Sequence, residues 1–236
     1  VRAVLIYAFG VAAVFAVVLA ARWLPEFGWP RAVWVSAFHT ISAFNNAGFD
    51  IMGDFRSMSA YVDDPVVNLS ISTLFILGGI GFSVVLNLCE LRERRLSTHS
   101  RLALVVTGWL IGVGVLVIVL LEWANTLAPL SGTGKLLGAY FTAVTPRTAG
   151  FNTLDTAALR PATQFFIITL MFIGACPGST GGGIKTTTFG LLAATVWSQG
   201  KGREDVEILG RRIPTEQVHR ALAVTLLSGG LVAFVA

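Results

Sequence analysis

The stretch "AFNNAGFD", residues 43–50, lies at the end of an uncharged run that begins at Ala32. It contains two asparagines, a glycine and an acid. Polar amides and a flexible glycine are costly to bury at the end of an apolar segment unless they have partners or a purpose. The chain nearly repeats the stretch, because "TAGFN" at residues 148–152 aligns with "NAGFD" at residues 46–50. Two copies of one polar loop indicate an element that the protein uses twice.

The composition is typical of a membrane protein. Of 236 residues, 54% are apolar and only 13% are charged, whereas a soluble domain carries about 25% charged residues. A helix that spans the hydrocarbon core needs about 20 apolar residues. Uncharged runs of about that size, the last one reaching the final residue, lie at residues 3–21, 65–89, 102–121, 161–184 and 221–236. The predicted fold class is an all-α integral membrane protein.

Two shorter uncharged segments, residues 32–49 and 136–146, lead into the two copies of the loop. Both are polar at the end, and the second is too short for a full span. A re-entrant segment, which enters and leaves on one side of the membrane, fits both better. The expected order is a long helix, a short re-entrant helix with a glycine loop, a long helix, and then the same again. Internal repetition of this kind predicts a repeated architecture.

Basic residues concentrate in two linkers, residues 91–101 and 198–220. They are Arg92, Arg94, Arg95 and Arg101 in the first, and Lys201, Arg203, Arg211, Arg212 and Arg220 in the second. Basic residues favour cytoplasmic loops, so both linkers are predicted inside and the re-entrant segments enter from outside. The formal charge of +4 therefore reflects membrane orientation, and no nucleic-acid partner is expected.

The two glycine loops suit an ion path. Non-helical backbone at membrane depth survives only where protein buries it or water reaches it. Glycine permits backbone angles that turn successive carbonyls toward one axis, and a ring of carbonyls replaces the hydration shell of a potassium ion. The carbonyl end of a short helix also carries the negative end of its dipole, which favours a cation. An ordinary turn is the alternative, and the second copy in the same position disfavours it.

Three motifs together resemble the Trk/Ktr/HKT superfamily of potassium transporters, with the closest likeness to the bacterial Ktr membrane subunit. They are "FHTISAFNNAGFD" (38–50), "AVTPRTAGFNTLD" (143–155) and "MFIGACPGSTGGGIKTTTF" (171–189). The resemblance implies four membrane–pore–membrane repeats around one potassium-channel-like pore. Residues 1–97 would be the second repeat, residues 98–204 the third with an interrupted second helix, and residues 205–236 the start of a further repeat in a longer polypeptide.

The resemblance also implies the site residues. The glycines of the selectivity filter would be Gly48 and Gly150. The other carbonyl donors would be Asn45, Asn46, Ala47, Thr148 and Ala149. Potassium, the expected substrate, would be held by the carbonyls of residues 46–48 and 148–150. A sodium-permeable or non-selective pathway stays open as an alternative because the first repeat is absent, and so does a non-conducting fragment because two loops do not complete a ring.

The segment "GACPGSTGGGIKT", residues 174–186, interrupts the fourth apolar run. Pro177 removes a helix hydrogen bond among many glycines. A phosphate-binding loop is excluded because Ile184 precedes Lys185 and because an apolar helix, not a strand, comes before the segment; a merely kinked helix remains an alternative. The resemblance implies an intramembrane gating loop beneath the filter. It would comprise Gly178, Ser179, Thr180, Gly181, Gly182, Gly183 and Lys185.

Three polar residues near these loops have individual expectations. Lys185 is an ionisable residue near membrane depth, where a function is the default hypothesis. It would either pin the loop to an acidic or carbonyl partner or repel cations when the loop is closed. His39 is expected to serve packing or hydrogen bonding, and Arg147 to turn away from the ion path and bind an acidic group that braces the loop.

The sequence contains no nucleophile–base pair, carboxylate dyad or metal cluster, so an enzyme is not predicted. The resemblance implies potassium uptake down the electrochemical gradient by a multi-pass protein of the cell (inner) membrane. It also implies a homodimer and a cytosolic nucleotide-binding regulatory subunit that docks on the inside linkers. No covalent cofactor is expected. Sodium stimulates transport in many members of this group, so sodium dependence is a further expectation.

Overall fold

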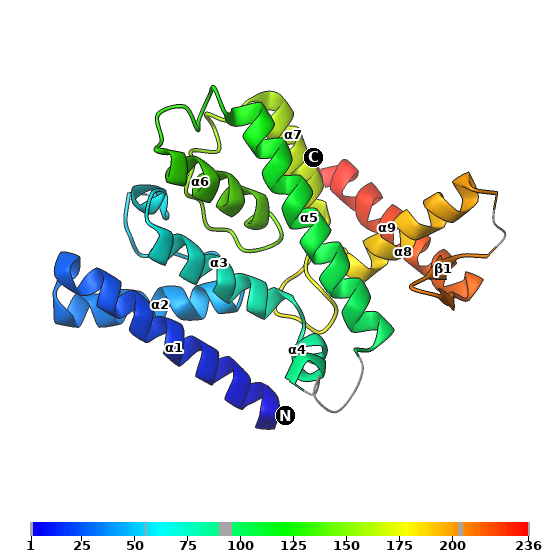
Figure 1. The fold of residues 1–236 in the computed structure, drawn as a ribbon, viewed down its shortest axis with the longest axis horizontal. Coiled ribbons are helices and arrows are strands. Elements are labelled where there is room, and N and C mark those ends of the chain that lie inside the picture. The colour runs from blue at the N-terminus through cyan, green and yellow to red at the C-terminus, as the bar shows by residue number, and fades with distance from the viewer. Residues whose placement is uncertain (1, 55, 90–95, 203–204, 236) are drawn as a thin grey trace.

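The computed structural model describes residues 2–54, 56–89, 96–202 and 205–235. The regular secondary structure of this part of the chain is helical apart from one short hairpin (Figure 1). Its elements are α1 (Arg2–Phe27), α2 (Trp29–Phe44), the 3₁₀ helix η1 (Ser59–Tyr61), α3 (Pro65–Gly79), α4 (Phe82–Cys89), α5 (Thr98–Glu122), α6 (Gly132–Val144), α7 (Pro161–Phe172), α8 (Thr186–Gly200), β1 (Glu207–Ile208), β2 (Arg211–Arg212) and α9 (Thr215–Val235).

Helices α1 and α5 are long and apolar enough to cross a membrane, with 26 and 25 residues. Their outer faces carry large apolar side chains that pack against nothing, such as Phe9 and Leu120, which are 74% and 71% exposed. In water such surface would be unfavourable, whereas the acyl chains of lipids accept it. The chain is an all-α integral membrane protein, as the composition predicts.

The described elements follow the expected order, with one difference in the run at residues 65–89. The sequence predicts a single long helix there. The structure ends α3 at Gly79 and starts α4 at Phe82, with an angle of 98° between them. The expectation of an unbroken helix is wrong because Gly81 adopts a left-handed φ of +91°, a conformation that interrupts a right-handed helix.

The interruption predicted in the run at residues 161–184 is confirmed. Helix α7 ends at Phe172 and α8 begins at Thr186. The segment between them folds back on itself, since Gly174 N–H donates to the carbonyl of Ile184 (2.9 Å) and Ala175 N–H donates to that of Gly182 (3.0 Å). This segment, residues 173–185, is called the intramembrane loop below. A simple kink is therefore the wrong interpretation.

The main core surrounds α3, which lies between the two short helices α2 and α6 (Figure 1). Its apolar side chains, including Ile71 and Leu74 of α3 and Phe141 of α6, are fully buried. Phe75 of α3 contacts Phe141 edge to face, with ring centroids 5.7 Å apart. Helix α3 thus holds both short helices in one block and fixes the loops that follow them.

The two basic linkers are only partly described. Arg92, Arg94, Arg95 and Arg203 lie outside the described residues. In the second linker, β1 and β2 form an antiparallel hairpin in which Glu207 pairs with Arg212. Arg211 and Arg212 are exposed on this hairpin.

Candidate functional site

The two glycine loops meet at their glycines. A Cβ atom added to Gly48 would lie 2.8 Å from the Cα of Gly150, and one added to Gly150 would lie 2.9 Å from the Cα of Gly48. Such distances leave no room for any side chain. The fold therefore brings together two glycines that are far apart in the sequence and that are both predicted to belong to the filter.

Both loops have the same backbone pattern. Asn46 and Gly48 have left-handed φ values of +51° and +74°, and Thr148 and Gly150 have φ values of +72° and +83°. The alanine between each pair does not. Left-handed φ values at alternate residues interrupt any regular helix or strand. The same departure at matching positions shows that the two loops are built alike.

Hydrogen bonds leave the carbonyls of the two loops free. Ala47 N–H donates to the carbonyl of Ser42 (2.9 Å), and Ala149 N–H donates to that of Thr145 (3.0 Å), so the loop amides turn back to the short helices. Among the described residues, no donor bonds to a carbonyl of residues 45–48 or 148–150. Asn45, Ala47 and Gly150 are exposed, so water or a cation can reach these loops and serve as the partner of their carbonyls.

Two hydroxyl groups that the sequence analysis missed fasten the loops just beyond the glycines. Ser42 Oγ donates to the carbonyl of Phe49 (2.7 Å), and Thr145 Oγ1 donates to that of Phe151 (2.5 Å). Both hydroxyls come from the last turns of the short helices. The sequence could have indicated these bonds, because each copy has a hydroxyl residue several positions before its Gly-Phe pair.

His39 supports the first loop from behind. Its Nδ1 lies 2.7 Å from the carbonyl of Val35, and its Nε2 lies 3.3 Å from the backbone nitrogen of Ile51. Nδ1 must therefore donate while Nε2 accepts, which fixes one neutral tautomer. The ring is fully buried. The expectation of packing and hydrogen bonding is confirmed.

The intramembrane loop contacts the first glycine loop. Asn46 Nδ2 donates to Thr180 Oγ1 (2.8 Å), and Thr180 Oγ1 donates to the carbonyl of Phe44 (3.1 Å). Within the intramembrane loop, Lys185 Nζ donates to the carbonyl of Gly181 (2.8 Å). Of the alternatives for Lys185, pinning to a carbonyl is the one that the structure contains.

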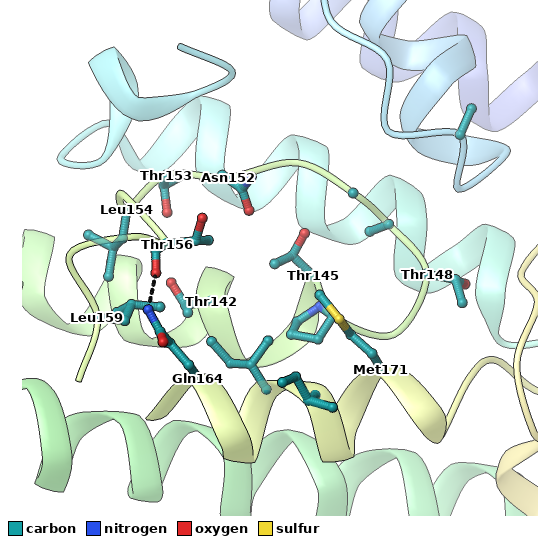
Figure 2. A pocket seen from close by; sticks show the side chains of 16 residues that line it. Thr142, Thr145, Thr148, Asn152, Thr153, Leu154, Thr156, Leu159, Gln164 and Met171 are labelled. Atoms are coloured by element: carbon teal, nitrogen blue, oxygen red, sulfur yellow. Dashed lines mark hydrogen bonds between the residues drawn. The ribbon is translucent and has the colours of Figure 1, made fainter. Parts of the chain in front are cut away.

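A cavity of about 690 Å³ lies beside the second glycine loop (Figure 2). Its polar lining consists largely of threonines, which lie around it together with Asn152 and Gln164. Gln164 Nε2 donates to the carbonyl of Thr156 (3.0 Å). Ala47 joins the lining, so both glycine loops border the cavity. The lining residues carry no charge, and their hydroxyls and amides suit water or a partly hydrated ion.

Comparison with known proteins identifies the family. The family model TrkH, described as a cation transport protein, matches residues 1–236. This chain belongs to the TrkH family of cation transport proteins. The TrkH family consists of transport proteins rather than enzymes, in agreement with the sequence analysis.

Two relatives illustrate the similarity. The Ktr system potassium uptake protein B of Bacillus subtilis (strain 168) is 41% identical over 97% of this chain and 52% of its own length. The potassium/sodium uptake protein NtpJ of Enterococcus hirae is 38% identical over 89% of this chain and 46% of its own length. The TrkH-family chain therefore spans about half the length of the curated relatives that it matches.

A solved structure shares the fold. The crystal structure of the potassium transporter TrkH from Vibrio parahaemolyticus superposes with a TM-score of 0.73 at 21% identity, covering 99% of this chain and 49% of that one. Identity at this level supports the architecture alone. Like that structure, the TrkH-family chain here has the helical arrangement of a membrane transporter.

Arg147 differs from its expectation. Its guanidinium lies 3.4 Å from Thr107 Oγ1 of α5, and within the described residues it forms no ion pair. The predicted acidic partner is wrong, because the acceptor near the guanidinium is the Thr107 hydroxyl and Arg147 Nε has no partner among the described residues. In this TrkH-family chain, Arg147 links the second glycine loop to α5 through a neutral hydroxyl.

Proposed function

We propose that the protein containing this chain takes up potassium across the cell (inner) membrane, and that Asn45–Gly48 and Thr148–Gly150 form two sides of its selectivity filter. The observation that supports this most is the convergence of two matched loops whose carbonyls lack donors among the described residues. The similarity to a potassium uptake protein and to a potassium/sodium uptake protein agrees with it.

The mechanism is dehydration followed by passage. Carbonyls of residues 46–48 and 148–150 replace water around a potassium ion. Helices α2 and α6 end at these loops, so the negative ends of their dipoles favour a cation there. Ser42 and Thr145 hold the next carbonyls away from the ion. In this proposal the ion moves down its electrochemical gradient, as the resemblance implies.

The gate in this proposal is Gly178–Gly183 with Lys185. This part of the intramembrane loop meets the first residue of each left-handed pair, since Thr180 bonds Asn46 and Gly181 packs against Thr148. A re-entrant helix that enters from outside is deepest at its end, so these residues form the inner end of the filter. A loop held there obstructs the ion, and its glycines permit movement.

A sodium-permeable pathway is the second candidate. It is supported by the similarity to a relative named as a potassium/sodium uptake protein. The two glycines of this chain favour potassium, since glycine lets the carbonyls approach one axis. Sodium dependence of potassium uptake belongs to the same proposal.

The organisation proposed for the longer protein follows the resemblance. Residues 1–97 and 98–204 are two membrane–pore–membrane repeats of a multi-pass protein, and residues 205–236 begin another. The protein is a homodimer in the lipid bilayer. A cytosolic nucleotide-binding subunit docks near residues 91–101 and 198–220. Arg211 is exposed there, and Arg212 is exposed beside its ion-pair partner Asp205; such surface charge suits a polar partner.

Flux through liposomes tests this function. The longer chain that contains this segment is reconstituted, and uptake of potassium and of sodium is measured at equal concentrations. We expect potassium to exceed sodium at least tenfold. Gly48→Ser and Gly150→Ser should each lower this ratio, because any Cβ atom at these positions forces the two loops apart. A monodisperse serine variant that keeps the wild-type ratio would contradict the filter assignment.

A deletion tests the gate. Removal of residues 178–183 should increase potassium flux several-fold, since the obstruction at the inner end of the filter is lost. Gly10→Ala, in α1 with no atom within 4 Å of the added Cβ, serves as the control. A correctly assembled deletion variant whose flux equals that of the wild type would rule out this gate.

A further inference from the structure

Thr180 lies at the point where the intramembrane loop meets the first glycine loop. Its hydroxyl accepts a hydrogen bond from the side-chain amide of Asn46 and donates one to the carbonyl of Phe44. A threonine hydroxyl has a single proton to donate, so its donor capacity is used in full. Among the described residues of the intramembrane loop, Thr180 alone bonds a filter residue through its side chain.

The backbone of Thr180 is held as well. Its N–H donates to the carbonyl of Gly78 at the end of α3 (3.1 Å). A Cβ atom on Gly78 would collide with the carbonyl of Phe44 and would lie 2.9 Å from Thr180 Oγ1. The end of α3, the end of α2 and the intramembrane loop are thus in close contact around one hydroxyl group. Movement of the loop backbone would carry that hydroxyl away from both of its partners.

The second glycine loop lacks an equivalent bond. Thr148 occupies the position that matches Asn46, and its buried Oγ1 has no hydrogen-bond partner among the described residues. Gly181 faces this hydroxyl, since a Cβ atom there would lie only 2.5 Å from it. The intramembrane loop therefore contacts both glycine loops through neighbouring residues, but it is bonded to only one.

We propose that Thr180 is a positioning residue that couples the gate to the filter. When the intramembrane loop is in place, Thr180 holds the side chain of Asn46 and so fixes the inner end of the first filter loop. When the loop leaves, the Asn46 amide and the Phe44 carbonyl lose this partner, and the filter entrance changes shape. Selectivity and flux then depend on the same hydroxyl. The proposal rests on the filter and gate of the proposed function.

Thr180→Val tests the coupling because valine keeps the shape of threonine and removes both side-chain hydrogen bonds. The Asn46 amide and the Phe44 carbonyl then lose this partner when the loop is held, so the balance between held and released loop should shift roughly tenfold. In the longer chain in liposomes, we expect roughly tenfold higher potassium flux and a potassium-to-sodium ratio lowered about threefold. Thr180→Ser retains the hydroxyl and should behave as the wild type.

The matched control is Thr225→Val. It makes the same substitution in α9, where the Thr225 hydroxyl donates to the carbonyl of Ala221 in the same helix (2.8 Å). Flux and selectivity in this variant should stay near wild-type values. If Thr180→Val equals Thr225→Val in both measurements, the coupling is overturned. Higher flux with an unchanged selectivity ratio also overturns it, because Asn46 would then be independent of the loop.

A thiol measurement keeps the test independent of conduction. Cys176 is fully buried in the intramembrane loop, whereas Cys89 is exposed. In a chain whose other cysteines are replaced by serine, N-ethylmaleimide should modify Cys176 roughly ten times faster in Thr180→Val than in the wild type or in Thr225→Val. Equal rates would overturn the role of Thr180. A wild-type protein that conducts no ions would instead refute the proposed function, and the modification rates would still decide whether Thr180 holds the loop.

Discussion

Both re-entrant segments are followed by a broken helix, but the two breaks differ in length. Between α3 and α4 the break consists of Ile80 and Gly81, and the chain turns by 98°. Between α7 and α8 it extends over residues 173–185. Backbone groups of the long break form hydrogen bonds with those beside the short one. Cys176 N–H donates to the carbonyl of Gly79 (2.9 Å), and Phe82 N–H donates to that of Gly178 (3.1 Å).

This difference shows that the two breaks depend on each other. A helix end leaves backbone groups without partners, and at membrane depth no bulk water satisfies them. The intramembrane loop supplies donors to the end of α3 and an acceptor to the start of α4. The sharp turn between α3 and α4 is therefore stabilised by the loop, and movement of the loop would remove these partners.

The largest effect is expected from Gly81→Ala. Alanine would be strained at a φ of +91°, and its Cβ would lie 2.5 Å from the carbonyl oxygen of Pro177. We expect a loss of about 3 kcal/mol in stability from strain and collision together, measured as thermal unfolding in detergent. Gly53→Ala is the control, because Gly53 has a φ of +89° with no atom within 4 Å of the added Cβ. If both variants lost the same stability, the contact between Gly81 and the intramembrane loop would contribute nothing to the stability of the turn.

A smaller effect is expected from Gly78→Ala in the last turn of α3. Its Cβ would collide with the backbone carbonyl of Phe44, so α2 and α3 must move apart at a cost of about 2 kcal/mol. Gly79→Ala is its neighbour in the same helix, with nearest atoms at 3.4 and 3.7 Å. Because alanine favours a helix over glycine, Gly79→Ala should be neutral or slightly stabilising. Denaturation of both variants under one condition measures the difference, and a stable Gly78→Ala would contradict the tight contact.

The smallest effect is expected within the intramembrane loop, from Gly181→Ala. The added Cβ would lie 2.5 Å from both the Ala175 Cβ and Thr148 Oγ1. The loop should shift away from the filter at a cost of about 1 kcal/mol, and potassium flux in liposomes should rise several-fold. Gly182→Ala adds a Cβ with no atom within 4 Å and should leave flux unchanged. The same flux in both variants would mean that the loop does not press on the filter at Gly181.

Much of the local structure was predictable because its causes are local. Long uncharged runs predict helices that cross a membrane. Gly48 and Gly150 indicate left-handed backbone, because glycine adopts this conformation without help from distant residues. The interruption after Phe172 follows from Pro177 and its glycines. The run at residues 65–89 contains a cluster of glycines, Gly78, Gly79 and Gly81, and the break there was missed because glycine inside a long apolar run is also tolerated in a continuous helix. Only the neighbouring loop makes the interruption visible.

The sequence by itself determined the membrane class, the two glycine loops, the broken helix after Phe172 and the resemblance to a transporter family. The tertiary structure alone decided which groups meet. Asn46 bonds Thr180, Gly48 touches Gly150, and the intramembrane loop satisfies the ends of α3 and α4. The physical reason is that composition and backbone preference act on neighbouring residues, whereas a hydrogen bond between distant residues requires the packing of whole helices.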